Sequence, residues 1–128
     1  KKRYLIDDLE NIETSKYDVL IMSAVLEHLD DYEKTLDKLL NSSADLFIFR
    51  TFLSEKDKIS EINDPNYLKN PYFINEYSIY KFSKKFINNG YSVNICPDKA
   101  TKNSKPYKVL NHGNFVRQMF FIVCKKQT

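Results

Sequence analysis

The chain has 128 residues, of which 42% are hydrophobic, so it can bury one core of ordinary domain size. Its 20 basic residues are balanced by 17 acidic ones, and a net charge of +3 is too small to indicate a nucleic-acid partner. No apolar run approaches the roughly 20 residues that span a bilayer, so no membrane partner is expected.

The first predicted elements are two strands separated by a polar connection. Residues 4–6 read as the end of a short strand, which Asp7 and Asp8 follow. Residues 17–22 form a nearly continuous apolar run, which is typical of a parallel strand covered on both faces. We therefore expect this second strand to be central in its sheet.

A helix is predicted to begin after Asp30 or Asp31, either of which can cap it, and Glu33 follows Asp30 at the spacing of a capping box. Its apolar residues share one face: Tyr32, Leu36, Leu39 and Leu40. Residues 44–51 form another apolar strand. The strand–helix–strand order favours two neighbouring parallel strands with a right-handed crossover.

Residues 52–71 are polar, and they predict a long loop with at most one short helical turn. Asn75 can cap the next helix, which should end at Asn88-Asn89-Gly90. The apolar face of this helix consists of Ile79, Phe82, Phe86 and Ile87. Residues 91–96 alternate as in a strand at the sheet edge, and residues 107–124 predict a terminal hairpin around Asn111-His112-Gly113-Asn114.

The two cysteines, Cys96 and Cys124, both fall in strand-like segments and lack a partner at metal-ligand spacing. We expect buried, reduced thiols in a cytoplasmic protein and no metal site.

Residues 17–31, YDVLIMSAVLEHLDD, resemble the middle of class I S-adenosylmethionine-dependent methyltransferases. In that family a strand of this type runs into a "VLEHL" turn, and the loop borders the cofactor and the reacting methyl group. The resemblance implies a Rossmann-like α/β fold, in which helices flank a mostly parallel sheet that closes with an antiparallel strand or hairpin. It also implies S-adenosylmethionine as the cofactor.

Residues 70–76, NPYFINE, resemble a group of bacterial methyltransferases found with surface-polysaccharide gene clusters. This second resemblance implies methyl transfer to a small-molecule or glycan acceptor.

The glycine-rich cofactor loop of the family has no counterpart here, because the chain opens at Lys1 and its only glycines are Gly90 and Gly113. Residues 1–128 are therefore interpreted as one domain fragment, the C-terminal half of a partial methyltransferase fold. We expect the full-length parent to be the enzyme and the fragment alone to be inactive.

The resemblance places Asp7 or Asp8 where the family accepts a hydrogen bond from the adenine amino group. The alternative is that both are solvated turn residues. Met22, Ser23 and Ala24 end the strand at the edge where open α/β sheets bind ligands, and they would line the methionine end of the cofactor. For Met22 the alternative is core packing.

His28 is the candidate base that removes the acceptor's proton, and its alternative role is to tie down the loop by hydrogen bonds. Arg50 and Thr51 end the next strand at the same edge. The guanidinium of Arg50 can hold an anionic acceptor, unless it forms a salt bridge with a loop carboxylate such as Glu55.

Tyr72 and Asn75 precede the second helix, where the family closes over its substrate. Aromatic residues at this position can equally staple the helix end to the core.

Two other function classes stay open. The first is a non-catalytic, methyltransferase-like module that associates with itself through an exposed sheet edge. The second is another Rossmann-like, nucleotide-dependent enzyme, since fold alone does not fix function. The closing hairpin and the VLEHL turn argue against the second class.

Overall fold

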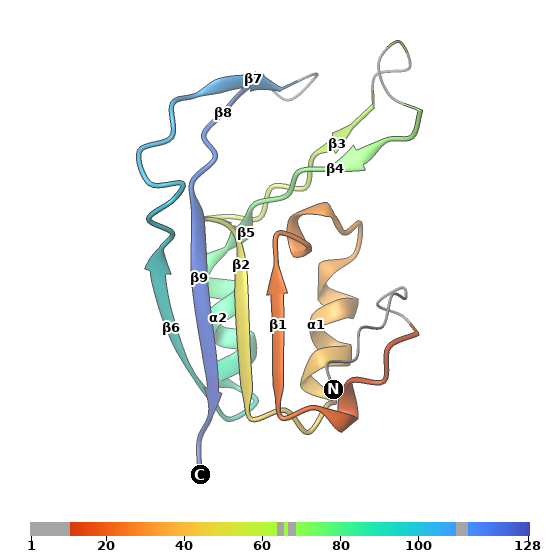
Figure 1. Cartoon of the computed structure of the whole chain (residues 1–128), viewed down its shortest axis with the longest axis vertical. Coiled ribbons are helices and arrows are strands. Elements are labelled where there is room, and N and C mark those ends of the chain that lie inside the picture. The colour runs from red at the N-terminus through yellow and green to blue at the C-terminus, as the bar shows by residue number, and fades with distance from the viewer. Residues whose placement is uncertain (1–10, 64–65, 67–68, 110–112) are drawn as a thin grey trace, which may run out of the picture.

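The computed structural model of the chain describes residues 11–63, 66, 69–109 and 113–128. The predicted strand at residues 4–6 and the candidates Asp7 and Asp8 lie outside these ranges. The centre of the fold is a five-stranded sheet with the order β1-β2-β9-β6, in which β5 also pairs with β2 (Figure 1). Its strands are β1 (Val19–Ser23), β2 (Leu46–Ser54), β5 (Tyr77–Ser78), β6 (Tyr91–Pro97) and β9 (Met119–Lys126).

The register confirms the predicted parallel pair. β1 runs parallel to β2 from the pair Val19 and Leu46 to the pair Ser23 and Arg50, so both strands finish at one edge of the sheet. β9, the last strand in the chain, lies between β2 and β6 and is antiparallel to both. The predicted C-terminal antiparallel strand is thus confirmed. β6 forms one outer edge of this sheet, also as predicted.

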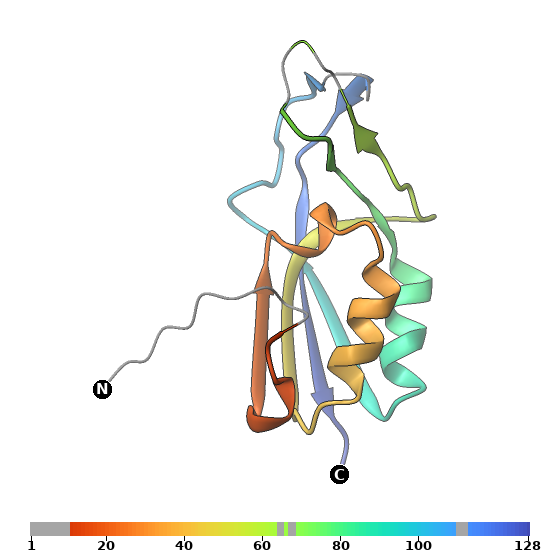
Figure 2. The ribbon, with the colours of Figure 1, turned by 90° about the vertical axis from the view of Figure 1, so that its right-hand side faces the viewer.

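Two helices, α1 (Tyr32–Leu40) and α2 (Ile79–Ile87), cover the same face of the sheet (Figure 2). Asp31 caps α1, because its side chain accepts a hydrogen bond from the Lys34 N–H at 3.0 Å. The cap of α2 is Ser78, whose hydroxyl accepts from the Lys81 N–H at 3.4 Å, so the prediction that Asn75 caps this helix is wrong.

The main core lies between the sheet and these helices. Phe47 and Phe49 of β2 meet Phe86 of α2 edge to face, with ring centroids 5.4 Å apart in both pairs. Leu20 and Met22 of β1 pack against this core from the strand side that faces the helices. The apolar run of β2 is thus explained by burial on the helical face and by its position between β1 and β9.

β1 does not have the central, doubly covered position that its sequence predicts. In the described part of the chain it is an outer strand, and its alternate residues Val19 and Ile21 are 47% and 70% exposed. These two side chains alternate with Leu20 and Met22, so they lie on the face that α1 and α2 do not cover. β1 therefore offers an uncovered apolar surface.

The expected long loop after β2 is also wrong, because this segment contains an antiparallel pair, β3 (Glu61–Ile62) and β4 (Tyr72–Phe73). The predicted terminal hairpin forms over a shorter range, between β7 (Tyr107–Val109) and β8 (Gly113–Phe115). β9 begins separately at Met119. Figure 1 shows both hairpins beyond the sheet end at which β1 and β2 finish.

A second hydrophobic cluster, here called the cap cluster, joins these hairpins to the sheet. Its members are Phe52, Ile62, Ile74, Phe115 and Met119. Ile62 has no exposed surface, although it stands in a polar stretch of sequence. Burial of such isolated apolar residues gives the short hairpins a hydrophobic anchor.

The cysteines differ from each other. Cys124 is buried, and burial raises the pKa of its thiol to about 12, whereas Cys96 is exposed, so the prediction of two buried thiols is wrong for Cys96. Within the described ranges no group of three His, Cys, Asp or Glu side chains could hold a metal ion. None of the helices described is both long and apolar enough to cross a membrane.

Candidate functional site

The candidate site begins at the turn after β1. Ala24 has a φ of 55°, in the left-handed region that residues with a side chain rarely adopt. Its N–H donates to the Arg50 carbonyl at 2.9 Å, which anchors the turn to the end of β2. A short 3-10 helix, η2 (Leu26–His28), follows and presents Glu27 and His28 near the carboxyl ends of both strands.

His28 is held in one tautomer. Its Nδ1 lies 2.7 Å from the carbonyl oxygen of Phe73 in β4. Because a carbonyl only accepts hydrogen bonds, Nδ1 must carry the proton, and the neutral ring keeps a lone pair on Nε2. The side chain is 51% exposed, so this lone pair is accessible to a reactant.

The side chain of Glu27 lies next to this imidazole. Its side chain is 2% exposed, its Oε1 is 4.0 Å from His28 Nε2, and its Oε2 accepts a hydrogen bond from the Thr51 hydroxyl at 3.0 Å. Thr51 has no exposed surface. A buried carboxylate in this position can stabilise a positive charge on the imidazole, and Thr51 holds that carboxylate in place.

Arg50 forms an ion pair with Asp98, not with the Glu55 considered from the sequence. Its Nη2 and Nε donate to Asp98 Oδ2 at 2.7 and 3.0 Å. The Ala100 N–H, which donates to Asp98 at 3.0 Å, is the largest cause that holds the Asp98 pKa below its usual value, and Arg50 and Thr101 act in the same direction. The binding role of Arg50 stays a prediction.

Asn75 is buried and hydrogen-bonded to the turn, whereas Tyr72 is exposed. Asn75 has no exposed surface; its amide accepts from the Ser60 N–H at 3.1 Å and donates to the Leu29 carbonyl at 2.6 Å. Its backbone N–H donates to the Glu27 carbonyl at 2.8 Å. The residue therefore links three chain segments, whereas Tyr72 lies exposed on β4.

A cavity of about 140 Å³ adjoins the turn. Three of its lining residues, Ala24, Glu27 and His28, come from the turn itself. The others are Tyr107, Arg117 and four members of the cap cluster: Phe52, Ile74, Phe115 and Met119.

Of the residues predicted from sequence, Ala24 and His28 line this cavity. Met22 packs against the main core, which is the alternative considered for it, and Ser23 is exposed at the end of β1. The cofactor contacts of Met22, Ser23 and Ala24 stay predictions. Sequence reasoning missed Tyr107 and Arg117, which stand in segments without a motif.

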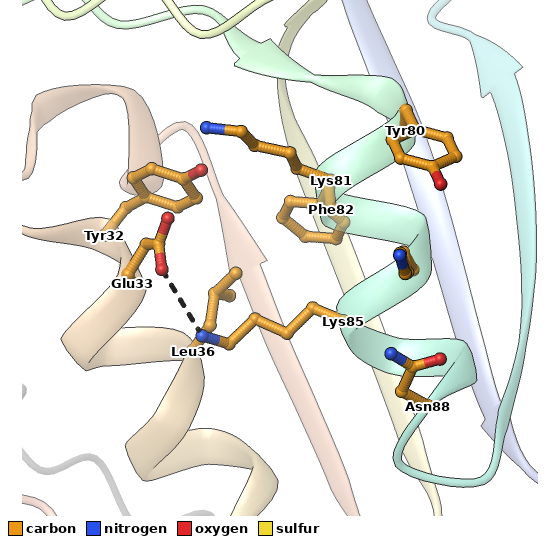
Figure 3. A pocket seen from close by; sticks show the side chains of 9 residues that line it. Tyr32, Glu33, Leu36, Tyr80, Lys81, Phe82, Lys85 and Asn88 are labelled. Atoms are coloured by element: carbon orange, nitrogen blue, oxygen red, sulfur yellow. Dashed lines mark ion pairs between the residues drawn. The ribbon is translucent and has the colours of Figure 1, made fainter.

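A larger groove, of about 340 Å³, lies between α1 and α2 (Figure 3). Two of the lysines that line it form ion pairs: Lys85 lies 3.8 Å from Glu33 and 2.7 Å from Asp37, and Lys81 lies 2.8 Å from Asp57. The smaller cavity has the stronger chemical case, because it combines a buried carboxylate with an accessible imidazole at the carboxyl ends of parallel strands.

No protein-family model matches this sequence, and no curated protein does. Solved structures do match. A SAM-dependent methyltransferase from Methanosarcina mazei superposes with a TM-score of 0.61 at 10% identity, over 98% of this chain and 68% of the other. A putative S-adenosylmethionine-dependent methyltransferase from Listeria monocytogenes gives 0.59 at 14% identity, over 95% and 68%. The fold prediction is thus confirmed, and this chain has the Rossmann-like α/β fold of S-adenosylmethionine-dependent methyltransferases.

Proposed function

We propose that this chain is the acceptor-binding part of an S-adenosylmethionine-dependent methyltransferase. The observation that carries the proposal is the cavity at the carboxyl ends of β1 and β2, which joins His28, Glu27 and the Ala24 turn. Open α/β sheets bind their ligands at this edge. The fold neighbours are consistent with this activity.

The end of β1 fits a cofactor of this kind. Ser23 is exposed at the end of β1, and the half-buried Ala24 that follows lines the cavity. Ser23 and Ala24, with Met22 beneath them, would hold the methionine end, and Asp7 or Asp8 would accept from the adenine. S-adenosylmethionine, when bound, supplies an electrophilic methyl group on a sulfonium.

The chain's own residues then act on the acceptor. A hydroxyl of the acceptor gives its proton to His28 Nε2 as the oxygen attacks the methyl carbon. The Phe73 carbonyl keeps the ring oriented through Nδ1–H, and Glu27 stabilises the imidazolium that forms. The cap cluster excludes water from one side of the reaction, and the cavity orients the acceptor.

We further propose that catalysis requires additional sheet structure beside β1. The support is that β1, in the described part of the chain, pairs with β2 alone and is therefore an outer strand of the sheet. The chain alone should then bind cofactor weakly and show no turnover. The same outer edge favours the second candidate function, a non-catalytic module that pairs β1 with another copy.

Calorimetric titration of S-adenosylhomocysteine tests the proposal. The titrations use this chain and a longer protein in which an N-terminal methyltransferase half, with the glycine-rich cofactor loop, precedes residue 1. Binding to the longer protein alone supports the methyltransferase assignment. Binding to neither, combined with a dimer mass in size-exclusion chromatography with light scattering, would favour the interaction module.

The role of His28 is tested in the longer protein. The variant His28→Asn keeps a donor near the position of Nδ1, so the bond to the Phe73 carbonyl can persist while the base is lost. We expect turnover to fall by about 10²-fold or more with unchanged S-adenosylhomocysteine affinity. Activity within a few fold of the unsubstituted protein would leave His28 with the loop-anchoring role alone.

A further inference from the structure

The walls of the small cavity suit an aromatic ring. Phe52 and Phe115 meet edge to face with centroids 4.8 Å apart, and Tyr107 meets Phe115 in the same way at 5.9 Å. Ile74 and Met119 add further apolar surface. A ring that enters this cavity would find both aromatic contacts and a polarisable thioether.

The size of the cavity limits what can enter. Its volume is about 140 Å³. An engineered apolar cavity of about 150 Å³ in another protein holds benzene, so one six-membered ring fits and two do not. A sugar ring of similar size carries several hydroxyl groups, which the four cap-cluster side chains cannot hydrogen-bond.

The cavity also has two polar sites of different kinds. One is the pair Glu27 and His28, at the turn after β1. The other is Arg117, which precedes β9, is exposed, and forms no ion pair with the described residues. A guanidinium without a carboxylate partner is available to an anion, whereas the carboxylate of Glu27 disfavours an anion at the turn.

We infer that the acceptor is a single-ring aromatic compound with a hydroxyl group and an anionic group, such as a hydroxylated aromatic acid. The inference rests on the proposed function, because the hydroxyl is placed at His28 where methyl transfer would occur. Phe52 and Phe115 contact the ring, and Arg117 binds the anionic group. The β7–β8 hairpin and the segment after it therefore determine specificity.

The inference is tested without cofactor, because the cavity residues all belong to this chain. The probes are 4-hydroxybenzoate, phenol and glucuronate, titrated into the ¹⁵N-labelled chain and followed by NMR. We expect 4-hydroxybenzoate to bind more tightly than either of the others and to shift the amide signals of Ala24, His28 and Phe115.

Arg117→Gln should weaken 4-hydroxybenzoate binding by roughly tenfold and leave phenol binding unchanged. Lys102→Gln is the matched control, because it also removes one exposed positive charge, from a residue that does not line the cavity. Tyr107→Ala should weaken the binding of both aromatic probes, 4-hydroxybenzoate and phenol.

Three results would overturn the inference: no binding of 4-hydroxybenzoate at millimolar concentration, equal binding to the Arg117→Gln chain, or tighter binding of glucuronate. These outcomes are separate from the cofactor titration. If S-adenosylhomocysteine binds and the aromatic probes do not, the acceptor class is rejected and the methyltransferase function stands. If the aromatic probes bind and S-adenosylhomocysteine does not bind even the longer protein, the cavity is an aromatic-acid site and its role in methyl transfer is rejected.

Discussion

Replacement of Asn75 by alanine should destabilise the chain, because the amide of this residue holds together segments that are far apart in sequence. The substitution removes the acceptor of the Ser60 N–H and a donor to the Leu29 carbonyl. Each partner is part-buried, and the loss of its bond costs about 1 to 1.5 kcal/mol. With the small void left by the amide, we expect a loss of about 3 kcal/mol in the free energy of unfolding.

Urea unfolding monitored by circular dichroism measures this loss, and the melting temperature should fall by about 10 °C. Asn94→Ala is the matched control, since Asn94 is exposed on β6; we expect a change of about 0.5 kcal/mol or less. A loss below about 1 kcal/mol in Asn75→Ala, together with weakened acceptor binding, would refute the reasoning and support the sequence-based assignment of Asn75 to the acceptor site.

Thr51→Val should cost about 1 to 3 kcal/mol in urea unfolding, because it leaves the buried Glu27 carboxylate without its hydroxyl donor; an unchanged midpoint would contradict this. In the native protein, iodoacetamide should label Cys96 and spare the buried Cys124, as mass spectrometry would show, and equal labelling would contradict the burial of Cys124. Asp98 has a lowered pKa in the folded state, so its ionisation stabilises the protein above the ordinary carboxyl pKa, and this contribution disappears as the pH falls through the lowered value. Wild type and Asp98→Asn should therefore differ in stability at neutral pH and converge in acid, whereas a difference independent of pH would exclude this linkage.

The elements that the sequence predicted well are those with strong local signals. The cap of α1 by Asp31, the end of α2 before Gly90 and the apolar run of β2 all follow from residues within one or two turns of each other. The cap of α2 was assigned to Asn75 although Ser78 fills that position. Asparagine and serine can both cap a helix, so the residue types alone do not decide between Asn75 and Ser78. What distinguishes them is tertiary structure, because Asn75 is buried among three chain segments.

The two projecting hairpins could not be predicted with the same detail. Their strands have two or three residues each, which is too short for a period-2 pattern to emerge. The pairing of Arg50 with Asp98 joins residues 48 positions apart, so spacing gives no indication of it. His28 and Ala24 were identified from a motif, whereas Tyr107 and Arg117 reach the cavity only through tertiary packing.

The cap cluster is separate from the main core, so the hairpins and the helix-covered sheet are stabilised by two different hydrophobic clusters. Phe49 of β2 belongs to the core and Phe52 of the same strand to the cap, so one strand supports both. Substitutions or length changes in the hairpins can therefore alter the shape of the cavity while the sheet and its helices stay packed. If the cavity binds the acceptor as proposed, exchange of the hairpins should change acceptor preference without unfolding the sheet.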